Sequence, residues 1–173
     1  MTLSETEIAG LLVISYKKFT DNRGNFVKSF QQSKISMNIA ESFYSISSKD
    51  VIRGMHFQQP PYDHSKLVFV ICGKITDVVI DLRKNSKTFG QYLSISLSAD
   101  NNKAIYIPSG FAHGFIAEED NTITNYFVSS EYNSKADSGV RWNSFGFDWG
   151  ISDPIVSDRD QAFPLLSDFS SPF

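Results

Sequence analysis

The segment Val51–Gln58 places an arginine, a glycine, a histidine and an amide among large apolar side chains. A neutral imidazole accepts a proton near physiological pH, and a guanidinium binds phosphate oxygens through two N–H groups at once. His56 is therefore a candidate general base and Arg53 a candidate phosphate ligand. The alternative interpretation is a satisfied core histidine beside an arginine in an ordinary ion pair.

The apolar residues around these two side chains predict a β-strand. Side chains alternate between the faces of a strand, so His56 and Gln58 share one face and regular pairing puts Arg53 on the other. Gly54 could carry a bulge or bend that turns Arg53 toward the face of His56. We therefore predict that this strand lines a reactive site inside a sheet.

The composition describes an ordinary globular chain that is rich in aromatic residues. Its 173 residues, with 41% hydrophobic and 20% charged, fit one domain, residues 1–173, able to bury about 70% of its unfolded surface. Fifteen Phe and seven Tyr favour sheet structure. A net charge of -3 argues against nucleic-acid binding, since such binding needs a basic surface.

The composition also indicates the cellular compartment of the protein. Cys72 is the only cysteine, which excludes an internal disulfide and fits a reducing compartment. No apolar run approaches the 18 or so residues of a membrane span, and no signal peptide is visible. We expect a cytoplasmic protein that does not bind membranes.

The elements that position these residues are expected to be many short strands with little helix. We predict flexible ends at residues 1–10 and 167–173, a short helix over 32–40 and another beginning after Ser157, which is a plausible N-cap. Close strand spacing favours an all-β sandwich or barrel. The predicted strands cover residues 11–16, 25–30, 42–48, 51–58, 66–72, 74–82, 93–97, 104–107, 113–117 and 122–128.

Six segments in order carry a family resemblance: Phe19–Gly24, Val51–Gln58, Lys66–Val68, Asp81–Gly90, Ile107–Phe115 and Val156–Gln161. Together, over about residues 10 to 166, they resemble the dTDP-4-dehydrorhamnose 3,5-epimerase family. The resemblance implies a cupin-like jelly roll, a homodimer, and neither metal nor cofactor. It also implies a nucleotide-linked 4-keto-6-deoxy sugar as substrate and a product used for deoxysugars of surface polysaccharides such as lipopolysaccharide O-antigen.

The 4-keto group acidifies the hydrogens on C3 and C5, so epimerisation needs a base, a group for the enolate oxygen and an acid on the opposite face. His56 is the candidate base. The resemblance implies that Asp160 orients it, that the Lys66 ammonium holds the enolate oxygen and that Tyr126 is the acid. Taken singly, His56 and Asp160 would be a structural ion pair, Lys66 a solvated strand end and Tyr126 a core residue. The prediction therefore rests on the four residues together.

Substrate binding is assigned to a second set. Arg53 is the first phosphate candidate, and the resemblance has Arg23 reach the partner subunit's site and His113 line this one. The full set that we predict is Arg53, Arg23, His113, Tyr132, Gln58, Phe26 and Lys28.

Three departures from the family pattern matter, and two of them lie on the nucleotide side. Lys28 stands where the family has Glu, Glu41 and Phe43 stand where it has Gln and Asn, and Ser144 replaces an Asp. We expect retained chemistry on a substrate whose nucleotide is open among dTDP, CDP and GDP. Epimerisation at C3 alone or at C5 alone is an alternative to action at both carbons.

Two other functions suit the same fold. A metal-dependent cupin oxygenase usually has a His-x-His pair among its ligands, but Gln58 stands two residues after His56. A non-catalytic nucleotide-sugar binding module would not need His56, Lys66, Tyr126 and Asp160 together. Both are weaker hypotheses than the epimerase.

Overall fold

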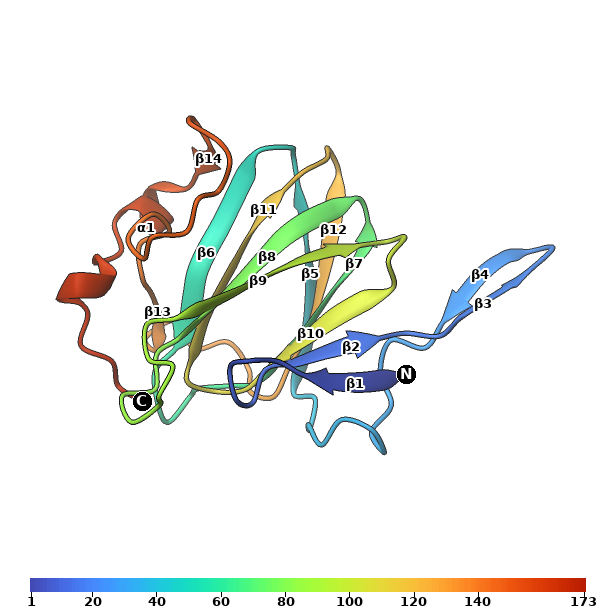
Figure 1. Cartoon of the computed structure of the whole chain (residues 1–173), viewed down its shortest axis with the longest axis horizontal. Coiled ribbons are helices and arrows are strands. Elements are labelled where there is room, and N and C mark those ends of the chain that lie inside the picture. The colour runs from blue at the N-terminus through green and yellow to red at the C-terminus, as the bar shows by residue number, and fades with distance from the viewer.

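The computed structural model describes residues 1–173 as two antiparallel sheets packed face to face, with a projecting hairpin and a C-terminal segment along one side (Figure 1). This all-β jelly-roll sandwich agrees with the predicted fold class. The first sheet has the strand order β1-β2-β10-β7-β12-β5. Its strands are β1 (Thr2–Glu5), β2 (Leu12–Ser15), β5 (Glu41–Ser47), β7 (Lys66–Cys72), β10 (Lys103–Ile107) and β12 (Thr122–Val128).

The second sheet has the order β13-β6-β11-β8-β9, and β14 adds to β6 in parallel. Its strands are β6 (Val51–Gln58), β8 (Lys74–Asp81), β9 (Tyr92–Ser98), β11 (Phe111–Ala117), β13 (Asp137–Gly139) and β14 (Ile155–Val156). The remaining elements are β3 (Lys18–Asp21), β4 (Gly24–Val27), the helix α1 (Asp158–Gln161) and a 3-10 turn over Leu166–Asp168.

Strand β7 is an internal strand of the first sheet, and its apolar run is buried on both faces of that sheet. Val68 and Val70 point into the core between the sheets, whereas Leu67 and Phe69 join a second apolar cluster on the outer face. Because residues of a strand alternate between faces, a strand buried on both faces must be apolar throughout.

The segment 32–40 is not the helix that the sequence analysis predicts, but a turn followed by irregular chain. Its buried residues are Ile35 and Met37, which pack on the outer face of the first sheet. Two buried side chains at a spacing of two match an extended segment rather than a helix. The predicted strand at 25–30 is also shorter, since β4 ends at Val27 and pairs only with β3.

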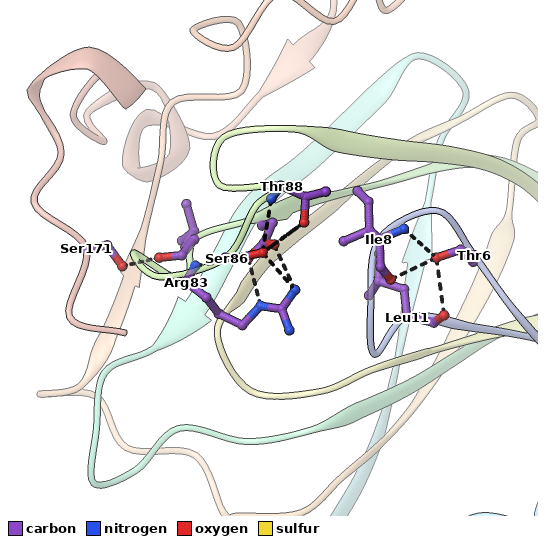
Figure 2. Close-up of polar contacts among 9 residues, drawn as sticks. Thr6, Ile8, Leu11, Arg83, Ser86, Thr88 and Ser171 are labelled. Carbon is purple, nitrogen blue, oxygen red and sulfur yellow. Dashed lines mark hydrogen bonds and ion pairs between the residues drawn. The ribbon is translucent and has the colours of Figure 1, made fainter.

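Both chain ends make specific contacts with the sandwich. Strand β1 pairs with β2, and Ile8 is buried beside a turn in which Thr6 contacts Ile8 and Leu11 (Figure 2). At the other end Ser171 is buried and donates a hydrogen bond to the carbonyl of Leu82. These contacts anchor single side chains within otherwise polar segments, and the flexibility of residues 1–10 and 167–173 stays a prediction.

The helix α1 begins where the sequence analysis expects. Ser157 is its N-cap and accepts a hydrogen bond from the backbone N–H of Asp160 at 3.2 Å. The cap holds Asp160 at the start of a one-turn helix that packs beside β6. No helix in the chain is both long enough and apolar enough to span a bilayer.

Candidate active site

A cavity of about 340 Å³ opens between the two sheets, along the side where β5 and β6 face each other. One wall comes from β5, β7 and β12 and the other from β6 and β11. The polar lining residues are Glu41, Ser45, Arg53, His56, Gln58, His64, Lys66, His113, Asp137 and Arg159, and the apolar or aromatic ones are Phe43, Phe57, Phe115, Tyr126, Val128 and Tyr132.

His56 and Asp160 form the central pair of this cavity. The Nε2 atom of His56 lies 2.8 Å from Oδ1 of Asp160, and the backbone N–H of Gly54 donates to Oδ2 of Asp160 at 3.0 Å. The carboxylate is thereby held by both oxygens. With the proton of the ring on Nε2, the lone pair of Nδ1 is available as a base.

The two groups are held in the protonation states that this role requires. Removal of water by packing lowers the pKa of His56 below its usual value, although the hydrogen bond and charge of Asp160 act in the opposite direction. Burial alone would raise the pKa of Asp160, but the hydrogen bonds from His56 and Gly54 outweigh it and the pKa is lowered. At neutral pH the pair is therefore a neutral imidazole beside a carboxylate.

Lys66 is the buried cation of the cavity. It stands at the start of β7, is 9% exposed, and its Nζ donates to the carbonyl of His56 at 3.1 Å. Burial lowers the pKa of Lys66 to about 8, with partial compensation by the charges of Asp137 and Asp77. The ammonium is charged at neutral pH and has lost most of its hydration, so it interacts strongly with a developing negative charge.

Tyr126 lies on β12 and is buried. Its ring contacts the edge of the His113 ring, with centroids 6.1 Å apart and planes at 71°. Burial raises the pKa of the Tyr126 phenol. The phenol therefore keeps its proton at neutral pH and can deliver it only to a stronger base, such as an enolate.

Arg53 reaches the same cavity because β6 is irregular at Gly54. The pairing of β6 with β11 shifts register between His113 and Phe115, and Gly54 has a φ of 138°. A Cβ at Gly54 would lie 2.6 Å from Cα of Gly114, so no larger residue fits this crossing. The predicted bulge is present, and it brings Arg53 and His56 to one cavity.

The Arg53 guanidinium is available for an anion. Its Nε donates to Oγ of Ser47 at 3.0 Å and its Nη2 to the carbonyl of Ile46 at 3.2 Å, and it forms no ion pair with a carboxylate. Neutral acceptors orient the side chain while its charge remains unneutralised.

A second histidine–carboxylate pair was not foreseen from the sequence. Nε2 of His113 lies 2.7 Å from Oδ2 of Asp77, and both residues are buried. The other oxygen of Asp77, Oδ1, has no hydrogen-bond partner. An aspartate in the middle of the apolar run Ile75–Ile80 was the available signal, because an isolated buried carboxylate needs a partner.

Arg159 and Asp137 were also missed. The Nη1 atom of Arg159 lies 2.9 Å from Oδ2 of Asp137, and its Nε lies 3.5 Å from Oδ1 of Asp160. Tyr132 donates from its hydroxyl to Asp137 at 3.2 Å. This chain of contacts connects the rim of the cavity with the carboxylate that orients His56.

Three residues of the predicted binding set lie away from the cavity of their own chain. Arg23 stands at the tip of the β3–β4 hairpin, which projects from the sandwich and pairs with no other strand (Figure 1). Phe26 is 58% exposed on the same hairpin, and Lys28 is exposed just beyond it. The hairpin is held only at its base, so it cannot bring these side chains to the cavity of the same chain.

Gln58 lines the cavity, but its amide is engaged with its own chain. Its Nε2 donates to the carbonyls of Tyr62 and Glu131 at 2.7 and 3.2 Å, and its Oε1 accepts from the N–H of Asn133 at 2.6 Å. The structure therefore gives Gln58 a role in fixing two loops beside the site. No group of three or more His, Cys, Asp or Glu side chains converges in the way that metal ligands do.

The fold and the cavity together define a class of protein: a jelly-roll sandwich whose cavity brings together an oriented imidazole, a buried ammonium and a buried phenol, groups that are suited to acid–base chemistry. Comparisons with known proteins identify the family. The family model described as dTDP-4-dehydrorhamnose 3,5-epimerase matches residues 5–168. The chain belongs to this family and is an isomerase with a cupin-like fold.

Individual relatives cover nearly the whole chain. A dTDP-4-dehydrorhamnose 3,5-epimerase of Shigella flexneri is 36% identical over 168 residues, which are 92% of this chain and 93% of the relative. The crystal structure of such an epimerase from Bacillus anthracis, with TDP and PPi bound, has a TM-score of 0.92 and 37% identity over 95% of this chain and 99% of that one. A Legionella pneumophila epimerase in complex with dTDP-4-keto-L-rhamnose has a TM-score of 0.92 and 31% identity, covering 98% and 94%.

Proposed function

We propose that the protein epimerises C3 and C5 of a nucleoside-diphosphate-linked 4-keto-6-deoxy sugar, with a dTDP-linked sugar as the first substrate to test. The observation that carries this proposal is the arrangement of His56 on Asp160, Lys66 and Tyr126 around one cavity. The relatives named above support the choice of dTDP, because their structures contain TDP or a dTDP-linked keto sugar.

The proposed reaction uses each group once per epimerised carbon. His56 removes the hydrogen beside the keto group and becomes an imidazolium that Asp160 stabilises. The electrons of the broken C–H bond move to the keto oxygen, where the Lys66 ammonium balances the charge. Tyr126 then returns a proton to the opposite face of the carbon, and solvent restores both groups. Oriented acid–base groups of this kind contribute about 10²–10⁴-fold each.

The diphosphate is assigned to the cations beside this centre. Arg53 carries a charge that no carboxylate neutralises, and Arg159 lies at the rim. Tyr132 is 61% exposed at the same rim and presents a ring on which a base can stack. His113 extends the wall next to Tyr126 and is assigned to contact with the sugar.

The proposal includes a homodimer. The β3–β4 hairpin exposes Arg23, Phe19 and Phe26, and Phe19 and Phe26 pack on each other with ring centroids 6.4 Å apart. An aromatic hairpin that projects from its own sandwich suits docking on a second copy, where Arg23 would reach the partner's cavity. A cytoplasmic location completes the proposal, and the lone free cysteine supports it.

The test is incubation of the purified protein with dTDP-, CDP- and GDP-linked 4-keto-6-deoxy sugars in heavy water, followed by NMR. We expect deuterium at both C3 and C5 of the dTDP-linked sugar. Deuterium at one carbon would restrict the reaction to that carbon, and preference for another nucleotide would reassign the substrate. No incorporation with any of the sugars would refute the epimerase.

Variants of the central pair sharpen this test. Asp160→Asn should lower the exchange rate by about 10³-fold or more, since loss of an orienting carboxylate leaves the imidazole in the wrong tautomer. Asp153→Asn is the matched control, because Asp153 is exposed in the same C-terminal segment. Equal rates for both variants would remove Asp160 from the mechanism.

A further inference from the structure

Strand β5 forms the outer edge of the cavity wall that carries Tyr126. It is the last strand of the first sheet and pairs only with β12. Its residues Glu41, Phe43 and Ser45 alternate onto the cavity side. No further strand of the chain lies beyond β5, so these side chains stand on the edge strand of the wall.

Phe43 stands directly opposite Tyr126 in the pairing of β5 with β12. The two rings are stacked, with centroids 4.7 Å apart and planes at 18°. Tyr126 is buried, whereas Phe43 is 43% exposed. Phe43 is thus the layer between the face of the Tyr126 ring and the cavity mouth.

The Tyr126 ring is held from two directions. Phe43 lies along its face, and the His113 ring meets it at 71°, itself anchored through the 2.7 Å contact with Asp77. Phe43 contributes only hydrocarbon to this arrangement. It can fix the plane of the phenol without forming a hydrogen bond to the hydroxyl, which stays available for proton transfer.

From this geometry we propose that Phe43 is a positioning residue that determines whether an abstracted proton is returned with inversion. The inference rests on the proposed epimerase function and on Tyr126 as its acid. Displacement of a reacting group by about 1 Å can cost 10²-fold in rate. If the phenol is misplaced, the enolate takes back the proton that sits on His56, on the face from which it left.

This return has a distinct signature in heavy water. The proton on the His56 imidazolium exchanges with solvent, so return from His56 places deuterium on the carbon with the original configuration. Return from Tyr126 places deuterium with inverted configuration. The fraction of inversion per exchange event therefore reports on the position of Tyr126, while the total exchange rate reports on His56 and Lys66.

The test compares Phe43→Leu with Phe43→Tyr, and Tyr126→Phe sets the lower limit of inversion. We expect Phe43→Leu to keep total exchange within about threefold of the original protein and to lower inversion per exchange by about tenfold or more. Phe43→Tyr retains the stacked ring and should match the original protein in both. Unchanged inversion in Phe43→Leu would overturn the proposal, and so would equal loss of exchange and inversion, which indicates a general loss of binding.

A measurement without substrate separates this inference from the proposed function. In protein labelled on the tyrosine rings, NMR should show faster flipping of the Tyr126 ring in Phe43→Leu than in the original protein or in Phe43→Tyr. Absence of any exchange in the original protein would refute the epimerase, whereas an unaltered Tyr126 ring in Phe43→Leu would refute the positioning role whatever the substrate is.

Discussion

Replacing the buried Lys66 by methionine should stabilise the protein while abolishing its reaction. Burial lowers the pKa of Lys66 from 10.5 to about 8. Since one pKa unit corresponds to about 1.4 kcal/mol, burying the charged form costs on the order of 3 kcal/mol of folding free energy. Methionine is similar in shape and carries no charge. Loss of the hydrogen bond to the carbonyl of His56 costs about 1 kcal/mol, which leaves an expected gain of about 2 kcal/mol at pH 7.

The gain should depend on pH in a defined direction. The folded-state pKa of Lys66 lies below the unfolded value, so between about pH 8 and 10.5 the unfolded chain binds more protons than the folded chain. The original protein is therefore stabilised relative to Lys66→Met as pH rises through this window. The advantage of methionine should be complete below pH 8 and nearly absent by about pH 10.5.

Urea unfolding at fixed protein concentration, at pH 7 and at pH 10, measures this difference. Lys103→Met is the matched control, because Lys103 is exposed on β10, and its free energy of unfolding should change by no more than about 0.5 kcal/mol. The reasoning is refuted if Lys66→Met is not stabilised at pH 7, or if its gain is the same at both pH values. Heavy-water exchange should be lost in Lys66→Met in either case.

Two further predictions concern Lys66 and the buried carboxylate Asp81. The value of kcat/KM should fall above about pH 8, where Lys66 loses its proton. On the acid side it should fall only below the usual histidine pKa of 6.5, because the pKa of His56 is lowered. Lys66→Arg should move the alkaline limb to higher pH, and an unmoved limb would exclude Lys66 as its origin. Asp81 is fully buried and accepts hydrogen bonds from Arg83, Ser86 and Thr88, and all three donors are labelled in Figure 2. Asp81→Ala should lower the free energy of unfolding by about 3–5 kcal/mol in urea titrations at pH 7. These bonds lower the pKa of Asp81 from 3.8 to about 2, so the stabilisation by the ionised carboxylate is complete above pH 3.8 and is lost as pH falls toward 2. A destabilisation of Asp81→Ala below about 1 kcal/mol at pH 7 would contradict the structure.

The strands of the sandwich were predictable because their signal is local. Alternation in Leu93–Leu97 and the apolar run before Cys72 depend only on which face each residue meets, and β9 and β7 lie where these patterns place them. The segment 32–40 misled the prediction because its few apolar residues lie among polar ones, and the alternation of Ile35, Met37 and Ile39, which fits an extended chain, was not weighed against a helix. Its burial against the outer face of the first sheet decides between the two.

The candidate site divides in the same way. The types and order of His56, Lys66, Tyr126 and Asp160 were recognisable as a set, and the structure places all four around or beside one cavity. Two other contacts at the cavity, His113 with Asp77 and Arg159 with Asp137, were not recognisable. Asp77 opposite His113 is a contact between residues far apart in the chain.

Residue type and alternation are properties of short segments, so the sheet-rich fold class, the family and the groups available for acid–base chemistry could all be inferred before the fold was known. The remaining features depend on long-range strand pairing. Gly54 made a bulge possible, but it is the pairing of β6 with β11 that shifts register there and brings Arg53 to the cavity of His56. The pairing of β5 with β12 likewise places Phe43 against Tyr126. Both depend on which strands become neighbours and in what register. Those choices are settled by long-range packing, and no single segment encodes them.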